Sequence, residues 1–143
     1  MIKHIELCRD YDVLTNIWTA SVMATHDFIS ENDIEFYRQK IPHDYMPNIE
    51  LYAVRNSNGE LCAFIGLNKD IIEMLFVHPD DMGKGYGSLL LQFAKESKGI
   101  RKVDVNEQNH PAVRFYMRHG FSIIGRDAFD GEGKPYPILH LGL

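Results

Sequence analysis

Three glycines alternate with other residues in the stretch "HPDDMGKGYGSLLLQFAKES", which runs from His78 to Ser97. They are Gly83, Gly85 and Gly87, and an apolar pattern typical of a helix follows them at once. A glycine has no Cβ, so the backbone N–H groups of such a loop can approach an anion closely. The positive end of the helix dipole would add to them. The pattern favours an anion-binding loop, but a tight strand-to-helix turn with glycines for packing explains it equally well.

Two common phosphate-binding motifs do not fit this loop. A Walker A motif, G-x-x-x-x-G-K-[ST], needs a lysine that reaches the β- and γ-phosphates, whereas Lys84 lies between two glycines. The dinucleotide fingerprint G-x-G-x-x-G does not match the three glycines, and the loop lies in the middle of the chain. An α/β domain that binds ATP or NAD is therefore disfavoured.

A second segment, "DVNEQNHPAVRFYMRHGF", follows the loop at the distance of one strand and one helix. Together with "MLFVHPDDMGKGYGSLLLQFA" it resembles the Gcn5-related N-acetyltransferase (GNAT) family, in particular its small bacterial single-domain members. The loop resembles the family's acyl-CoA pyrophosphate motif, Q/R-x-x-G-x-G/A. The second segment resembles the family's helix with Asn, then Phe-Tyr, then Gly-Phe. Met82 stands at the Q/R position, where its backbone amide can still serve but an Arg or Gln side-chain contact is lost.

The resemblance implies an N-acetyltransferase that moves an acetyl group from acetyl-CoA to a primary amine by direct attack in a ternary complex. The amine must be neutral to attack, the thioester oxygen gains negative charge, and the leaving thiolate needs a proton. We favour a small-molecule amine over a protein lysine or N-terminus, because no pattern in the sequence indicates an extended peptide groove. The alternative is a non-catalytic CoA-binding sensor or regulatory module, which the missing Arg or Gln at Met82 favours.

The resemblance also implies which residues hold acetyl-CoA. Backbone atoms of Phe76 and Val77 would bind the pantetheine arm at a free strand edge, and an N–H there would polarise the thioester carbonyl. Three other positions also have plainer explanations: Lys84 as a solvated side chain, Asn106 as a strand-end hydrogen-bonding group and Asn109 as a helix cap. The full set of expected cofactor positions is Leu75, Phe76, Val77, Met82, Gly83, Lys84, Gly85, Tyr86, Gly87, Ser88, Asn106, Asn109 and Tyr116.

Tyr116 and Glu73 are the two candidates for catalysis. Tyr116 stands in "RFYMRHG", where the family places its general-acid tyrosine, and a phenol with a pKa of about 10 can donate a proton to the thiolate. Its other possible role, packing the helix on the sheet, suits Phe115 better. Glu73 is the one charge inside an apolar strand, which is costly unless the carboxylate is paired or functional. Relatives often use a strand glutamate as the base; the alternatives are a solvent-facing edge residue or a structural ion pair.

The stretch "THDF" is the first candidate for contact with the acceptor, because the family builds its acceptor pocket between its first two helices. His26, Asp27 and Phe28 would line that pocket. The alternative is that Asp27 or Thr25 caps a helix, His26 is solvated and Phe28 is core. Further possible pocket walls are Trp18, Tyr45 and Tyr136. The seven histidines show no H-x-x-x-H or similar spacing, so we expect no metal.

The periodicity of apolar residues predicts an α/β domain over 1–143, with a mixed sheet and helices in the order β-α-α-β-β-β-α-β-α-β-β. The resemblance implies that this central sheet is mostly antiparallel and flanked by the helices. The first helix begins at Tyr11 after Asp10, and the second begins near Ser30 or Asn32 and stops at Pro42. A continuous apolar run predicts a strand at 71–79 with both faces covered. The other expected elements are strands at 2–8, 100–106, 121–129 and 135–143, a hairpin whose strands end near 55 and 67, and helices after the glycine loop and at 109–120.

Composition narrows the possible partners. Lys and Arg number 15 against 20 Asp and Glu, a net charge of -5, which argues against a nucleic-acid groove. Cys8 and Cys62 lie far apart in the sequence and are expected to be reduced thiols. No apolar run has the length of a signal segment or of a membrane span, so we expect a cytoplasmic protein with no membrane partner. The sequence leaves open whether it is a monomer or a homodimer.

Overall fold

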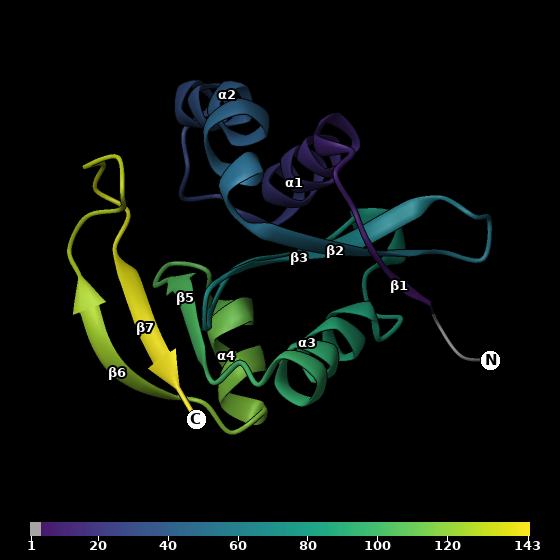
Figure 1. Ribbon diagram of the computed structural model, residues 1–143. Helices are drawn as coiled ribbons and strands as arrows, with labels where there is room; N and C mark the ends of the chain where they lie inside the picture. Colours follow the sequence, from purple (N-terminus) through teal and green to yellow (C-terminus); the bar gives the residue numbers. More distant parts are fainter. Residues whose placement is uncertain (1–3) are drawn as a thin grey trace.

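The computed structural model describes residues 4–143 (Figure 1). They form one seven-stranded mixed sheet in the order β1-β2-β3-β4-β5-β7-β6. The strands are β1 (Ile5–Leu7), β2 (Glu50–Arg55), β3 (Leu61–Asn68), β4 (Ile71–Val77), β5 (Lys102–Asn106), β6 (Ser122–Asp127) and β7 (Ile138–Gly142). The helices are α1 (Tyr11–Thr25), α2 (Glu31–Lys40), α3 (Tyr86–Lys98) and α4 (His110–Arg118). This agrees with the fold class and the element order expected from the sequence.

The helices cover both faces of the sheet. α1 and α2 lie over one face, and α3 and α4 lie over the other (Figure 1). Each face has its own buried core. The core under α1 includes Leu14, Trp18 and Phe64, and the core over α3 includes Leu90 and Leu141. Since an antiparallel strand sends alternate side chains to opposite faces, β3 contributes to both.

The sheet divides into two arms between β4 and β5. These strands form a parallel pair whose register covers Ile71 opposite Lys102 and Ile72 opposite Val103. Beyond these pairs the two strands separate (Figure 1). On its other side β4 stays paired with β3, but the register skips Glu73, because Met74 lies opposite Gly66 and Ile72 opposite Leu67. This β-bulge changes the direction of the side chains where the arms part.

Three expectations about the elements need correction or qualification. Pro42 does not end the second helical segment, because a π-helical turn at Ile41–Tyr45 continues from α2, followed by a 3-10 turn at Met46–Asn48. Proline has no N–H to donate four residues back, and the wider turn accommodates this loss. The faces of β4 are not both covered: Glu73 is exposed and the last three residues are only half-buried. Leu75 and Phe76 border a cavity, whereas Val77 lies outside its wall. Residues 2 and 3 of the first predicted strand lie outside the described residues.

Candidate active site

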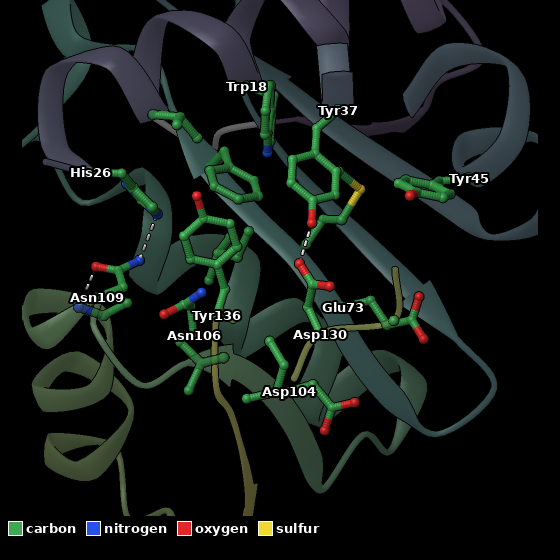
Figure 2. Close-up of a pocket in the computed structure, with 18 of the residues that line it drawn as sticks. Trp18, His26, Tyr37, Tyr45, Glu73, Asp104, Asn106, Asn109, Asp130 and Tyr136 are labelled. Atoms are coloured by element: carbon green, nitrogen blue, oxygen red, sulfur yellow. Dashed lines mark hydrogen bonds between the residues drawn. The ribbon is translucent and has the colours of Figure 1, made fainter. Parts of the chain in front are cut away.

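A cavity of about 580 Å³ occupies the space between the two arms of the sheet. α1, α2, β4, β5, α4 and the β6–β7 connection all contribute to its wall. Among the residues predicted from the sequence, its wall brings together Glu73, Leu75 and Phe76 of β4, Asn106 of β5, and Tyr116 of α4 with its N-cap Asn109. Figure 2 shows Glu73, Asn106 and Asn109 among them. The separation of β4 from β5 creates this space, because from Glu73 onward the edge of β4 that faces β5 has no partner strand in residues 4–143.

The glycine loop has the backbone geometry that its sequence predicts. Gly83 and Gly85 have φ angles of +77° and +89°, a region that L-amino acids other than glycine rarely adopt. No atom lies within 4 Å of the place that a Cβ would take at either residue. Gly85 is the N-cap of α3, and the first turn of an α-helix leaves N–H groups without an intrahelical acceptor. The loop can therefore present the amides of Gly87 and Ser88 to a pyrophosphate, which fits acetyl-CoA.

Side chains of the loop contribute less than its backbone. The Lys84 Nζ lies 3.2 Å from Oδ1 of the buried Asp81, so the lysine is ion-paired and not simply solvated. Tyr86 is 4% exposed and its ring belongs to the core, which leaves only its backbone for a ligand. The Ser88 hydroxyl lies 3.5 Å from Nε2 of His119. Met82 is exposed.

Tyr116 is held rigidly where α4 meets the cavity. Its ring is 4% exposed and packs edge-on against Phe115 and Phe121, with ring centroids 5.3 Å and 5.7 Å away. Burial raises the pKa of its phenol well above the ordinary value of 10, because a phenolate would be poorly solvated there. The hydroxyl is therefore protonated at neutral pH, the state that a proton donor requires.

Glu73 lies in the bulge of β4, with its side chain at the opposite part of the cavity from Asn109 (Figure 2). Its Oε1 accepts a hydrogen bond from Nδ2 of Asn68 at 3.0 Å. A neutral amide holds the carboxylate in place without neutralising its charge. The Glu73 side chain faces solvent, which was one of the two alternatives to a catalytic role, and it also lines the cavity.

Asn109 and Asn106 have the structural roles that were considered for them, as a helix cap and a strand-end hydrogen-bonding group, and both also face the cavity. Asn109 caps α4, since its Oδ1 accepts the N–H of Ala112 at 3.4 Å. Asn106 closes the end of β5, since its Oδ1 accepts the N–H of Gln108 at 2.9 Å. Both side chains line the cavity, so neither role excludes contact with a cofactor.

His26 bridges the two sides of the cavity. Its Nε2 lies 3.2 Å from Nδ2 of Asn109, and its Nδ1 lies 2.7 Å from Oγ1 of Thr25 (Figure 2). Since Thr25 donates its hydroxyl proton to the carbonyl of Ser21, it accepts from the Nδ1–H of His26. His26 is thus a neutral imidazole with both nitrogens bonded, not a solvated side chain.

The other two residues of "THDF" differ in their placement. Phe28 stacks on His26 with centroids 5.0 Å apart and lies 6.3 Å from the ring of Tyr136. Asp27 is exposed, and neither Asp27 nor Phe28 is part of the cavity wall, so their contact with the acceptor stays a prediction. Neither Asp27 nor Thr25 caps the following helix. Ser30 does, by accepting the N–H of Asp33 at 3.1 Å.

The environment of His26 predicts a pH dependence of folding stability. Burial lowers the pKa of its imidazole to about 4, against a smaller opposing effect of Asp27. Between pH 4 and about 6.5 the unfolded chain therefore binds a proton that the folded chain does not, and stability falls as pH falls through this window. We expect the free energy of unfolding to fall by about 1 to 2 kcal/mol between pH 7 and pH 5. Urea unfolding at both pH values measures it, and His26→Gln is expected to abolish this part of the slope; an unchanged slope contradicts the assignment.

Three tyrosine–carboxylate hydrogen bonds join α2 and the turn that follows it to the β6–β7 loop beside the cavity, and sequence reasoning missed them. The hydroxyls of Tyr37, Tyr45 and Tyr136 donate to Asp130, Glu132 and Asp33 respectively. We refer to these six residues as the clasp. Lys134 strengthens it, with its Nζ 2.9 Å from Oδ1 of Asp33. Tyr45 and Tyr136 were expected as pocket walls, and both line the cavity (Figure 2).

Two negative findings concern the part of the chain that the structure describes. No three His, Cys, Asp or Glu side chains in residues 4–143 are arranged to hold a metal ion. None of the helices there is long and apolar enough to cross a bilayer.

Comparisons of the sequence and of the structure with known proteins all lead to acetyltransferases. Residues 48–123 match the family described as "Acetyltransferase (GNAT) domain". A protein of Salmonella typhimurium named "Peptidyl-lysine N-acetyltransferase YjaB" is 38% identical over 128 residues, which cover 90% of this chain and 88% of that protein. The solution structure of apo-form YjaB from Escherichia coli has a TM-score of 0.87 at 34% identity, covering 99% of this chain and 97% of that one. The PaiA N-acetyltransferase of Thermoplasma acidophilum, in complex with coenzyme A, has the same fold, with a TM-score of 0.72 at 21% identity over the full length of both chains.

Proposed function

We propose that this chain, which belongs to the GNAT family of acetyltransferases and is an acetyl-CoA-dependent N-acetyltransferase, acetylates the ε-amine of lysine side chains in polypeptides. Relatives with 38% and 37% identity over 90% of the chain are named peptidyl-lysine N-acetyltransferases. The observation that carries the proposal is the cavity that joins the predicted cofactor side, at Asn109 and Tyr116, to a wall with several carboxylates at Glu73, Asp104 and Asp127. A lysine ammonium on a slender apolar stem suits such a wall.

The residues of the cavity, together with Val77 and the glycine loop outside its wall, could meet each need of the transfer. Acetyl-CoA supplies the thioester whose acetyl group is transferred. The glycine loop would hold the pyrophosphate, and the open edge of β4 at Phe76 and Val77 would bind the pantetheine arm and stabilise charge on the thioester oxygen. Glu73 would take the proton of the amine, directly or through water. Tyr116 would give its proton to the departing thiolate.

A small-molecule amine is the second candidate, and the clasp favours it. The six clasp residues join the β6–β7 loop to α2 and the turn after it, and this connection would restrict the access of a folded partner to the cavity. The non-catalytic alternative is not favoured, because the relatives named above are enzymes.

The test has two steps. Thermal unfolding is recorded with acetyl-CoA, CoA, ATP or NAD, and the first two are expected to raise the midpoint by mass action. Acetyl transfer is then measured with lysine-containing peptides and, in parallel, with free amines of similar length. Transfer to peptides at a kcat/KM at least tenfold above that for free amines supports the proposal. The reverse ratio supports the small-molecule candidate and overturns the lysine proposal.

A further inference from the structure

Four charged side chains cross the sheet in a row on the side that faces the cavity. They are Glu73 on β4, Asp104 on β5, His140 on β7 and Asp127 on β6, and all four line the cavity. The strand order places them side by side, because β7 is inserted between β5 and β6. His140 lies directly opposite Asp104 in the β5–β7 register. None of the last three residues was singled out by the sequence patterns.

His140 is bonded on both sides. Its Nδ1 lies 2.6 Å from Oδ1 of Asp104, and its Nε2 lies 3.0 Å from Oδ2 of Asp127. An ionised carboxylate only accepts hydrogen bonds, so two such neighbours require a proton on each ring nitrogen. His140 is therefore an imidazolium. In agreement, its pKa is raised, chiefly by the bond to Asp104; burial opposes this shift, and the bond to Asp127 adds to it.

The sheet makes room for this ring at Gly125, which lies opposite His140 on β6. A Cβ at Gly125 would lie 3.3 Å from Cδ2 and 3.6 Å from Cβ of the histidine, closer than most such contacts. The absence of a side chain at Gly125 lets the imidazole span from β5 to β6.

Asp104 is next to Glu73 where the arms part. The last pair of the β4–β5 register is Ile72 opposite Val103, so Glu73 and Asp104 follow it on the two strands. Paired strands lie about 5 Å apart and β4 and β5 separate from this point, so the space between the two carboxylates is open to an ammonium group that enters the cavity. The cavity wall includes two further carboxylates, Asp130 and Glu132, whose oxygens accept from clasp tyrosines. Within the described chain no Lys or Arg belongs to this wall.

We propose that Asp104 is an acceptor-binding residue that holds the incoming ammonium beside Glu73, and that His140, fixed by Asp127, is the positioning residue that orients Asp104. The inference rests on the proposed function as far as it concerns an amine acceptor, whether a lysine or a small molecule. With His140 protonated, the row of four carries a net charge of -2. Loss of that proton leaves a single N–H for the two carboxylates of Asp104 and Asp127 and adds repulsion among the carboxylates.

The test compares Asp104→Asn with Asp70→Asn. Asp70, like Asp104, is an aspartate with a basic partner: its Oδ2 lies 3.6 Å from Nζ of Lys102. It lies outside the cavity wall. Loss of a charged hydrogen bond predicts that Asp104→Asn raises KM for the amine about tenfold or more, with KM for acetyl-CoA within about twofold of wild type. Asp70→Asn is expected to change neither. Equal KM values in the two variants overturn the proposal.

Two variants of His140 separate positioning from a merely structural role. His140→Leu is expected to raise the amine KM as Asp104→Asn does. His140→Gln, whose amide can still donate to Asp104, is expected to keep the amine KM within about threefold of wild type. It should also remove the decline that wild-type kcat/KM shows as pH rises through the raised pKa of His140. If both variants lower only the melting temperature and leave KM and the pH profile unchanged, the positioning role is wrong.

A binding measurement keeps the inference independent of turnover. In protein labelled with ¹⁵N-histidine, butylamine is expected to shift the ring resonances of His140 in wild type but not in Asp104→Asn. If no lysine peptide is acetylated and these shifts occur, the lysine proposal fails and the acceptor site stands. Ring resonances that do not move at saturating butylamine overturn the inference.

Discussion

Tyr116→Phe is expected to lower kcat for acetyl transfer by about a hundredfold and to leave the affinity for CoA within about twofold of wild type. The variant removes one hydroxyl from a ring that is otherwise packed between Phe115 and Phe121, so the shape of the cavity stays. Proton donation by a positioned side chain contributes about 10² to 10⁴ in rate. Steady-state kinetics with the best amine, and the shift of the unfolding midpoint by CoA, measure the two quantities.

Tyr52→Phe provides the matched control. The Tyr52 hydroxyl donates to Glu50 at 2.9 Å, and its ring lies outside the cavity wall, so its loss is expected to leave kcat unchanged. Because burial raises the pKa of Tyr116 above its ordinary value, ionisation of this phenol is not expected to limit the wild-type rate at mildly alkaline pH. A Tyr116→Phe variant with wild-type kcat would show that another group, or water, protonates the thiolate.

The features that sequence analysis predicted correctly are local elements of structure, which depend on near neighbours in the chain. The glycine loop, the cap at Asn109 and the position of Tyr116 in α4 follow from spacings within one turn or one helix. The hairpin between β2 and β3 follows from Gly59, whose φ is +80°. Such local rules act the same way wherever the segment lies in the fold, and this is why the order of elements could be predicted.

The parts that escaped prediction depend on contacts between distant segments. Asp104 and His140 are 36 residues apart, and they meet because β7 is inserted between β5 and β6. Tyr37 and Asp130, in the clasp, are 93 residues apart. In the sequence, the polar run around Asp130 predicts a turn and nothing more. The bulge at Glu73 could not be predicted from the sequence either, because it arises from the pairing of β4 with β3 and not from the composition of β4.

Gly85→Ala is expected to raise KM for acetyl-CoA by tenfold or more, because the added methyl group occupies the space where the pyrophosphate would approach the backbone. Its φ of +89° also strains any L-residue, at a cost of about 1 to 2 kcal/mol. These two effects must be separated, because strain alone could disturb the start of α3. Urea unfolding and the KM for acetyl-CoA measure them individually.

Gly59→Ala makes that separation possible. Gly59 has a φ of +80° and, like Gly85, no atom within 4 Å of the place that a Cβ would take. It lies in the hairpin turn between β2 and β3 and outside the cavity wall. Both variants are therefore expected to lose about the same free energy of unfolding, and Gly85→Ala alone is expected to lose affinity for acetyl-CoA. If Gly85→Ala binds acetyl-CoA as Gly59→Ala does, the pyrophosphate does not lie against this glycine. The cofactor contacts of α3 would then be confined to the amides of its first turn, at Gly87 and Ser88.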